Sequence, residues 1–374
     1  MPTLAQPEVG WKCAVCGERV AIGTPLSWRC PNSNDHDTHH VLQIEQPIAP
    51  LRSTGDDNPY IAFRKYLAWD SFAAALGMSE DARIALIREA DAAVQRVAGT
   101  GFRFTPFARH DALSDALGFA AGGGVWVKDE TLGVAGSHKS RHLFTEMLHL
   151  LAAEQAGTAS WSTPEARPPL AIASCGNAAF AASTLAEAMS WPIEVFVPEN
   201  AAAELTDLLL SVGANIVRCP RLPNDPPGDP CVHRFREAVA QGAIPFGVQG
   251  TENAWCLDGG RTIGWEMADS MERVSGPPLD RVFIQVGGGA YAASCGWLSS
   301  HLGRNQQSHL ASFAVISKLY HPESPRRGDS REKPPTNHNG FAAPLICITL
   351  IGSSVRRIIT RVKKNCRGRE GIEN

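Results

Sequence analysis

The feature that most constrains the fold is an alternation of short apolar runs with helical segments between about residues 124 and 289. Runs such as PLAIASCG and PIEVFVPEN have the length and apolar character of buried strands, and segments with helical spacing separate them. This alternation is typical of βαβ units in a mostly parallel sheet. Because 374 residues are many for a single core, we expect an α/β protein with two packed subdomains.

The predicted elements place the loops where chemistry is expected. Strands are predicted at 124–130, 169–176, 192–200, 214–219 and 281–289, and helices at 140–156, 178–190, 201–212 and 232–241. One or two further helices are predicted within 59–98. Ligands of open parallel sheets bind beyond the carboxyl ends of the strands, so the loops that follow the strands are the candidate sites.

The first candidate loop contains GSHKSRH, from Gly136 to His142. It is not a phosphate-binding P-loop, because only two residues separate Gly136 from Lys139. A lysine at a helix start lies near the positive end of the helix dipole, which disfavours the charged amine. That environment suits a nucleophile that forms a Schiff base. For this motif alone, a solvated helix start remains the alternative.

The second candidate loop, SCGNAAFAAS, begins at Ser174 directly after an apolar strand. Backbone N–H groups at the start of the following helix favour an anion, and Gly176 allows it to approach closely. Ser174 and Asn177 add a hydroxyl and an amide donor. The alternative is an ordinary helix cap, for which Ser and Asn are common choices.

The third candidate loop, QVGGGAYAASCGW, also leads from a strand into a helix. Gly287, Gly288 and Gly289 remove every Cβ from the turn, which leaves a nest of N–H groups suited to a phosphate. The dinucleotide fingerprint G-x-G-x-x-G is absent. A flexible turn without a ligand is the alternative here.

The three loops together indicate one cofactor. An amine nucleophile, an anion loop with an amide, and a phosphate nest are predicted at the same edge of one sheet. A cofactor that carries both an aldehyde and a phosphate would use all three, and pyridoxal phosphate is such a cofactor.

On these residues the sequence resembles the fold-type II pyridoxal-phosphate enzymes, which include threonine synthase, threonine/serine ammonia-lyase, cysteine synthase and the tryptophan synthase β subunit. KDETLGVAGSHKSRH is similar to the family's segment around the Schiff-base lysine, SCGNAA to its substrate-carboxylate loop, and GGGA to its phosphate loop. DGGRTIGWEM, from Asp258 to Met267, looks like the threonine synthase variant of a helix that lines the site. The resemblance implies the family's α/β fold, which has two open parallel-sheet subdomains with the cofactor between them.

The resemblance also implies a role for each matching residue. Lys139 is implied as the Schiff-base and catalytic lysine, Asn177, Gly287, Gly288, Gly289 and Ala290 as further cofactor ligands, and Ser174, Gly176, Asn177 and Ala178 as ligands of the substrate carboxylate. The implied enzyme is a pyridoxal-phosphate-dependent lyase of the threonine synthase or threonine/serine ammonia-lyase type. It abstracts the α-proton of an amino acid and then carries out β- or γ-elimination or replacement. The alternative is a catalytically impaired, truncated cofactor-binding remnant or an interaction module.

A cysteine cluster precedes the predicted catalytic region. CAVC, with Cys13 and Cys16, and the later Cys30 resemble the first three ligands of a zinc ribbon, with which threonine synthase-like proteins often begin. The usual second Cys-x-x-Cys pair is broken, so a fourth ligand has to be one of three histidines: His36, His39 or His40. A degenerate ribbon that has lost its zinc is the alternative.

The chain is therefore predicted to comprise three parts. They are a zinc-ribbon-like segment at 1–45, the catalytic region at 46–317 with about 165–245 forming most of the smaller subdomain, and a basic, disordered tail at 318–374. The tail has 12 Lys and Arg against 5 Asp and Glu, and its stretch HPESPRRGDSREKPPTNHNG is polar and Pro-rich. We expect the family pattern to stop near Ile316.

Charge and composition limit the expected partners. The net charge of −3 gives no reason to expect nucleic acid, and the apolar run at 341–352 is too short to span a bilayer. No signal sequence is visible at the N-terminus, and the ten cysteines do not suggest a small secreted scaffold. We expect a cytoplasmic protein without a membrane partner that binds a small amino-acid substrate and forms a homodimer.

Overall fold

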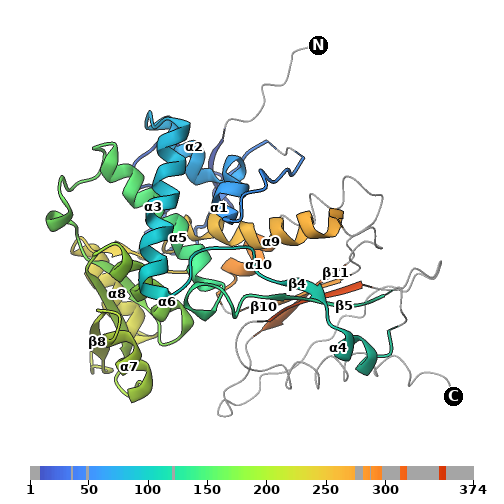
Figure 1. Ribbon diagram of the computed structural model, residues 1–374. Helices are drawn as coiled ribbons and strands as arrows, with labels where there is room; N and C mark the ends of the chain where they lie inside the picture. The colour runs from blue at the N-terminus through green and yellow to red at the C-terminus, as the bar shows by residue number, and fades with distance from the viewer. Residues whose placement is uncertain are drawn as a thin grey trace.

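The computed structural model describes residues 9–34, 37–47, 50–119, 123–273, 281–286, 288–296, 312–317 and 345–350. The described strands form three sheets (Figure 1), which we call the large, small and ribbon sheets. Every strand and helix predicted between 124 and 289 is present, with ends that differ by a few residues. The prediction of an α/β fold with two parallel sheets is therefore confirmed.

The large sheet has the strand order β11-β10-β12-β5-β4. Its strands are β4 (Phe107–Arg109), β5 (Gly124–Asp129), β10 (Arg281–Val286), β11 (Ser312–Ser317) and β12 (Leu345–Leu350). The pairs β11–β10, β10–β12 and β12–β5 are parallel, whereas the short edge strand β4 is antiparallel to β5. Helix α4 (Asp111–Ala116) covers part of β5 and packs Leu113 against Val125 and Val127.

Strand β12 lies inside the stretch for which the sequence predicted disorder. It is central in the large sheet, where Leu345 is in register with Gly124 of β5 and Ile346 with Arg281 of β10. The expected disorder therefore does not extend over these six residues. The remainder of 318–374 lies outside the described residues.

The small sheet has the order β8-β7-β6-β9 and is parallel throughout. Its strands are β6 (Leu170–Ala173), β7 (Ile193–Pro198), β8 (Asn215–Cys219) and β9 (Ile244–Pro245), and its helices are α6 (Asn177–Ala188), α7 (Ala203–Leu210) and α8 (Pro230–Ala240). Neighbouring residues of β6 enter different cores, since Ile172 packs into the main cluster with α6 whereas Ala171 joins Phe235 of α8. The sheet is thus buried on both faces, as an apolar parallel sheet requires.

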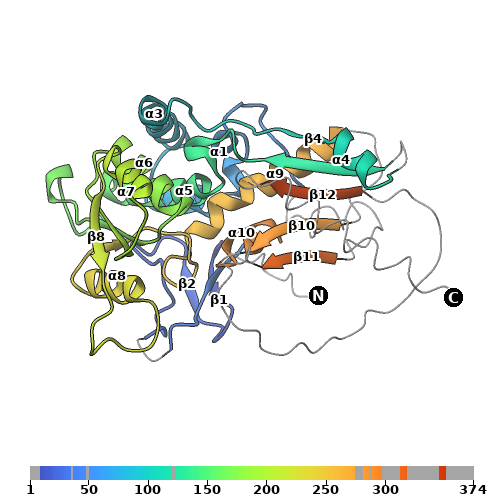
Figure 2. The ribbon, with the colours of Figure 1, turned by 90° about the horizontal axis from the view of Figure 1, so that it is seen from below.

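The N-terminal segment forms the ribbon sheet, with the order β2-β1-β3 and antiparallel pairing. Its strands are β1 (Gly10–Cys13), β2 (Arg19–Ala21) and β3 (Leu42–Glu45). In Figure 2, β1 and β2 lie between the large sheet and the helices of the small sheet. Trp11 and Leu42 anchor this small sheet in the main hydrophobic core.

The segment 59–98 is helical as predicted, but it is divided into more pieces than expected. It contains α1 (Pro59–Ala62), the short 3-10 helix η1 (Arg64–Tyr66), α2 (Ala68–Ala75) and α3 (Glu80–Ala98). The turn between α2 and α3 contains Gly77 at φ +86°, and Ser79 then caps α3 by accepting a hydrogen bond from the Ala82 N–H.

Helices α5 (Lys139–Gln155) and α9 (Cys256–Arg273) cross at the centre of the molecule (Figure 1). Two glycines of α9 make the crossing possible. A Cβ at Gly259 would lie 1.9 Å from the Arg141 carbonyl oxygen, and one at Gly260 would lie 2.2 Å from a ring carbon of His142. The α9 segment flagged by the family resemblance is therefore the helix that packs most closely on the first turns of α5.

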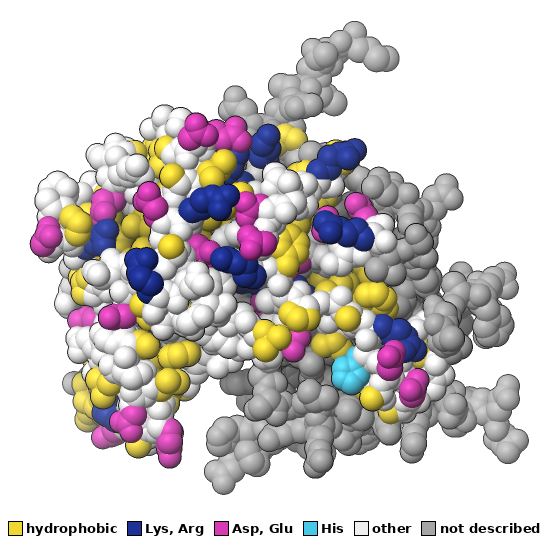
Figure 3. Space-filling model, viewed as in Figure 1, with side chains coloured by type: hydrophobic (Ala, Val, Ile, Leu, Met, Phe, Trp, Pro, Cys, Tyr) yellow, Lys and Arg dark blue, Asp and Glu magenta, His cyan; other side chains and the backbone are white. Residues whose placement is uncertain are grey.

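The remaining elements are short. They are the 3-10 helices η2 (Val134–Gly136) and η3 (Pro164–Ala166), and helix α10 (Ala290–Cys295). On the face in Figure 3, basic and acidic side chains are scattered among hydrophobic ones. Within the described ranges, no helix has the length and apolar character that a bilayer span needs.

Candidate active site

Lys139 is the first residue of α5 and follows the tight turn η2. The Ser140 hydroxyl lies within hydrogen-bond distance of two carbonyl oxygens, Val134 at 2.8 Å and Ser137 at 3.1 Å, and so holds this turn against the helix start. Burial lowers the pKa of the Lys139 amine below its usual 10.5. Such an amine is neutral at lower pH than an exposed lysine, which makes it a better nucleophile.

Four charged side chains beside this turn form a buried cluster, which we call the ion cluster: Lys128, Glu130, Arg141 and Glu266. Arg141 donates to Glu130 at 2.7 Å and also pairs with Glu266, which in turn pairs with Lys128. Burial opposes the charge on Glu266, but the two cations lower its pKa overall. Two cations and two anions thus balance, and they tie α5 to β5 and α9.

A second set of buried atoms next to Lys139 has no hydrogen-bond partner among the described residues. We call it the unpaired group: Ser137 Oγ, His138 Nδ1 and His142 Nε2. Nδ1 of His142 lies 2.7 Å from the Cys256 carbonyl oxygen, which only accepts, so Nδ1 carries the hydrogen. Burial lowers the pKa of His142 to about 3, so the ring is neutral and Nε2 presents an unused lone pair.

The first turn of α5 also contacts the helix that follows the third candidate loop, which we call the glycine loop. The ring of His138 lies 4.5 Å from that of Tyr291 on α10, and the ring of His142 lies 6.2 Å from it. Burial lowers the pKa of His138, and the nearby Lys139 adds to this effect. The lysine turn and the glycine loop are therefore neighbours, although about 150 residues separate them in the sequence.

A cavity of about 510 Å³ lies beside the glycine loop. Gly288, Gly289 and Ala290 line it, and Gly289 has φ +88°, a conformation that favours glycine. Opposite them, β3 and the preceding Val41 form another part of the wall. Arg261 is the one charged residue among the described residues that line this cavity, and burial lowers its pKa to about 10. Arg261 therefore remains a cation at neutral pH.

A smaller cavity of about 60 Å³ lies at the second loop, where Ser174 and Ala178 line it. Gln249 lines both cavities. Val248 lines the smaller cavity. Its carbonyl oxygen lies 3.9 Å from the position that a Cβ on Gly288 would occupy. The second and third loops are therefore adjacent.

Not every predicted residue lines these two cavities. Lys139 is not among the lining residues, but His142 on the same helical turn lies 2.7 Å from the Cys256 carbonyl oxygen, and the next residue, Leu257, lines the larger cavity. Asn177 is exposed at the start of α6, and Gly176 immediately precedes it. Gly287 lies outside the described residues.

Three residues of the candidate site were not predicted from the sequence: Arg261, Gln249 and His142. Arg261 stands within DGGRTIGWEM, so its position in a motif was the one signal that could have identified it. His142 lies three residues after the lysine, on the same helix face, but no local pattern distinguishes it from an ordinary buried histidine.

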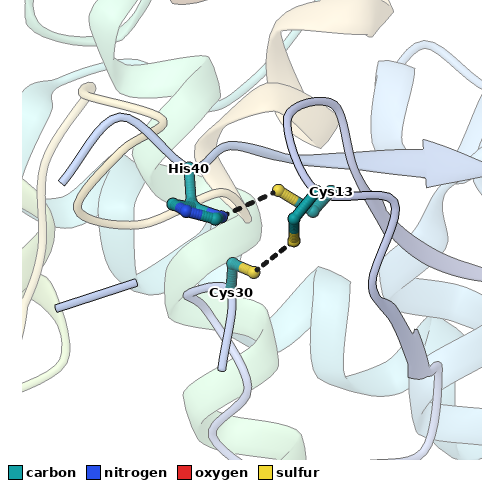
Figure 4. A group of neighbouring side chains, drawn as sticks. Cys13, Cys30 and His40 are labelled. Carbon is teal, nitrogen blue, oxygen red and sulfur yellow. Dashed lines mark hydrogen bonds between the residues drawn. The ribbon is translucent and has the colours of Figure 1, made fainter. Parts of the chain in front are cut away.

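The N-terminal cysteines come together in a second candidate site, the metal cluster: Cys13, Cys16, Cys30 and His40. Their ligand atoms all lie within 4.8 Å of one another, and Figure 4 shows Cys13, Cys30 and His40 converging from separate segments. Of the three candidate histidines, His40 faces the sulfur atoms, His39 is exposed, and His36 lies outside the described residues.

The metal cluster has the supporting contacts that metal ligands require. Nδ1 of His40 lies 3.4 Å from the Cys13 sulfur, and Nε2 lies 3.2 Å from a carboxylate oxygen of Asp37. A carboxylate on the far nitrogen fixes the ring orientation and the tautomer of a ligating histidine. Gly17, directly after Cys16, has φ +77°, which closes the turn that brings Cys13 and Cys16 together. The arrangement suits one zinc ion.

Comparisons with known proteins found similar solved structures and one matching family. Among solved structures, the chain is similar to maize serine racemase (17% identity, 63% of this chain and 60% of that chain, TM-score 0.43). It is also similar to diaminopropionate ammonia lyase from Escherichia coli (20% identity, 62% of both chains, TM-score 0.45) and to threonine deaminase isoform 2 from Solanum lycopersicum (19% identity, 64% and 57%, TM-score 0.43). The chain thus spans 57% to 62% of the length of these proteins. No curated protein sequence matches it.

A family profile described as "Pyridoxal-phosphate dependent enzyme" matches residues 99–363. The expectation that the family pattern stops near Ile316 is therefore wrong, because the match continues through β12 and beyond. The polar stretch between β11 and β12 concealed this continuation from inspection of local motifs. The match covers well over half of the 374 residues, and the chain belongs to the pyridoxal-phosphate-dependent enzyme family.

Proposed function

We propose that this chain is a pyridoxal-phosphate-dependent lyase of the threonine synthase or threonine/serine ammonia-lyase type, with Lys139 as the lysine that holds the cofactor. The observation that carries the proposal is the environment of this amine. Burial lowers its pKa, the ion cluster fixes the helix from which it extends, and the unpaired group beside it offers polar atoms to a ligand.

The chemistry of the larger cavity fits the phosphate of this cofactor. Backbone N–H groups of a glycine loop favour an anion, and Gly288 and Gly289 lie at this cavity. Arg261 adds a cation to the lining, although it is also paired with the buried Asp258 carboxylate at 3.1 Å. The cavity also has the volume expected for a small-molecule site. We assign Gly287 and Ala290 to the same loop, as the resemblance implies.

The second loop would hold the substrate's carboxylate. Ser174 and Ala178 line the smaller cavity, and the start of α6 directs backbone N–H groups toward an anion. Asn177 and Gly176 lie at that helix start. Because this loop adjoins the glycine loop, a substrate carboxylate and a cofactor phosphate would bind close to each other at separate anion sites.

When bound, the cofactor supplies an electron sink for the electrons left on the substrate's α-carbon. The chain's own contribution to that step is a base. The amine of Lys139 would take the α-proton in its neutral form, and burial lowers its pKa so that this form exists at lower pH than for an exposed lysine. Nε2 of His142 is an acceptor in the same turn and would orient the amine or a polar group of the ligand.

The finer assignments are part of the same proposal. The boundaries predicted from the sequence, 1–45 for the ribbon and 46 for the start of the catalytic region, serve as proposed domain limits, but the predicted end at 317 is moved beyond β12, which belongs to the large sheet and to the family match. A cytoplasmic homodimer is the proposed working form. Size-exclusion chromatography with light scattering measures that assembly directly.

The experiment that tests the function is a screen of amino acids against the cofactor-loaded protein. We expect threonine or serine to change the visible absorbance and to release an α-keto acid with ammonia. Lys139→Ala should abolish the absorbance change and lower the rate of α-keto acid release on the order of a thousandfold or more. Lys65→Ala, which removes an exposed lysine, should change neither.

Two outcomes would contradict the proposal. Racemisation of the amino acid without keto acid would exclude the lyase assignment. Cofactor binding without turnover of any amino acid would instead favour the cofactor-binding remnant.

A further inference from the structure

We propose that the metal cluster binds one zinc ion that holds β3 in place as a wall of the cofactor cavity, so that zinc and cofactor strengthen each other's binding. The inference rests on the proposed function in one respect, the assignment of the larger cavity to the cofactor. The metal site itself follows from the ligand geometry.

The distances between the ligand atoms match a tetrahedron. With zinc–sulfur bonds of about 2.3 Å, two sulfur ligands of a tetrahedral ion lie about 3.8 Å apart. The sulfur atoms of Cys16 and Cys30 are 3.7 Å apart, and the Cys13 sulfur is 3.4 Å from Nδ1 of His40. Three thiolates and one imidazole in this geometry select zinc over oxygen-preferring cations such as magnesium or calcium.

The cluster also has donors that support its sulfur ligands. The Val15 N–H lies 3.4 Å from the Cys13 sulfur, and the Asn32 side-chain amide lies 3.4 Å from the Cys16 sulfur. N–H donors of this kind, together with the Asp37 carboxylate on His40, stabilise charged ligands around a cation. The cluster therefore has both a first ligand set and the contacts that orient it.

The ribbon sheet needs such an ion. Its strands have only three or four residues, and segments this small seldom fold without a metal or disulfides. The free thiols of Cys13, Cys16 and Cys30 form no disulfide in the structure. One end of the segment is anchored independently, because the Trp28 carbonyl accepts from Ala254 and the Trp28 ring packs edge-on against Trp255.

The other end of the segment leads directly into the cavity wall. His40 is followed at once by Val41 and β3, and Val41, Gln43 and Ile44 line the larger cavity with the glycine loop. Val41 also packs against the cluster that contains Ala290.

Two backbone links couple this wall to the metal ligands. The Ala14 N–H, between two cysteine ligands, donates to the Val41 carbonyl at 2.9 Å, and Cys13 is in register with Leu42. Loss of the ion would remove the His40 anchor and loosen both links. Leu42 would still hold β3 to the main core, so this wall of the cavity would become more mobile without detaching.

The test compares two adjacent histidines. His40→Ala removes a ligand, whereas His39→Ala removes an exposed neighbour and serves as the matched control. His40→Cys replaces the imidazole by a thiolate and should restore zinc binding. For each protein we would measure the zinc content, the hydrogen exchange of the β3 amides without cofactor, and the dissociation constant for pyridoxal phosphate.

The expected result has three parts. The wild type and His39→Ala carry about one zinc ion per chain, and His40→Ala carries none. In His40→Ala the β3 amides exchange faster and the cofactor dissociation constant rises on the order of tenfold. His40→Cys regains zinc, slow exchange and cofactor affinity.

A chelator titration of the wild type covers the case in which His40→Ala does not fold. Because coupling is reciprocal, bound pyridoxal phosphate should lower the apparent dissociation constant for zinc by the same factor. Zinc loss that leaves β3 exchange and cofactor affinity unchanged would overturn the inference, as would a wild type that takes up no zinc. A wild type that binds zinc but no cofactor would instead overturn the proposed function.

Discussion

Two groups of buried polar atoms meet at the first turn of α5. In the ion cluster the charges are paired with one another, whereas the atoms beside Lys139 have no partners among the described residues. In the ion cluster, Arg141 is paired with carboxylates on two other elements, and positive and negative charges balance. Two residues earlier, Lys139 has a lowered pKa and stands beside atoms without partners. Paired buried charges hold a structure together, whereas buried polar atoms left without partners call for another explanation, of which a ligand is one.

Unpaired atoms alone do not mark the site. Glu146 and His149, further along α5, also have a buried atom without a partner among the described residues. His149 instead stacks on Trp255 at 4.4 Å within the core. What distinguishes the group at Lys139 is its contact with α10, the helix that follows the glycine loop, through the rings of His138 and Tyr291.

The largest effect is expected from breaking the ion cluster. Glu266→Gln leaves Arg141 and Lys128 buried with one anion between them. Loss of one partner from a buried ion pair costs about 3–5 kcal/mol, so the free energy of unfolding should fall by that amount. Glu272→Gln, an exposed position on the same helix, should change it by less than about 0.5 kcal/mol.

Denaturant unfolding measures both variants. If Glu266→Gln were as stable as Glu272→Gln, the ion cluster would not be a structural clamp, and the contrast with the lysine environment would fail.

A smaller effect is expected at His142. His142→Asn retains a donor for the Cys256 carbonyl but removes the acceptor at Nε2. The dissociation constant for pyridoxal phosphate should rise on the order of tenfold, which corresponds to one lost hydrogen bond. His149 has the same hydrogen-bond pattern through Thr145 and a pKa lowered to about 3, but it lies roughly 10 Å further along the helix than His142.

His149→Asn is therefore the matched control. It should lower the free energy of unfolding and leave cofactor affinity unchanged. Equal losses of affinity in the two variants would show that the unpaired nitrogen at His142 has no special relation to the ligand.

The smallest effect is expected in the pH dependence of cofactor capture, by which we mean the reaction of the Lys139 amine with pyridoxal phosphate. Capture needs the neutral amine, and burial lowers the pKa of Lys139. The rate should therefore rise with pH through a midpoint below 10.5, the value of an ordinary lysine. At pH values between the lowered pKa of Lys139 in the folded chain and 10.5, the unfolded chain binds more protons at Lys139 than the folded chain does. The contribution of Lys139 to the free energy of unfolding therefore also rises with pH in this range. Stopped-flow absorbance measures capture, and a midpoint at 10.5 would contradict the burial of the amine.

Local pattern was sufficient for most elements and for the three loops. The strand PLAIASCG and the following helix became β6 and α6 because an apolar run and a helical period are local properties. The position of β12 between β5 and β10 was not predictable, because it depends on pairing between Leu345 and Gly124, more than 200 residues apart. The polar stretch before β12 also gave no sign that a strand would follow.

The candidate site shows the same limit. Lys139 could be proposed from the sequence because it stands within a motif, whereas the Lys128–Glu266 pair joins residues that only the fold brings together. His36, His39 and His40 are nearly equivalent by spacing. Backbone geometry alone directs His40 to the sulfur atoms and leaves His39 exposed.

The most direct test of the central claim is to identify the lysine that holds the cofactor. Borohydride reduction of the pyridoxal-phosphate-loaded protein fixes the cofactor on that lysine, and peptide mass spectrometry locates it. We predict the label on Lys139, with Lys128 unlabelled because its amine is paired with Glu266. A label on Lys128 or on the exposed Lys65, or none on Lys139, would contradict the account.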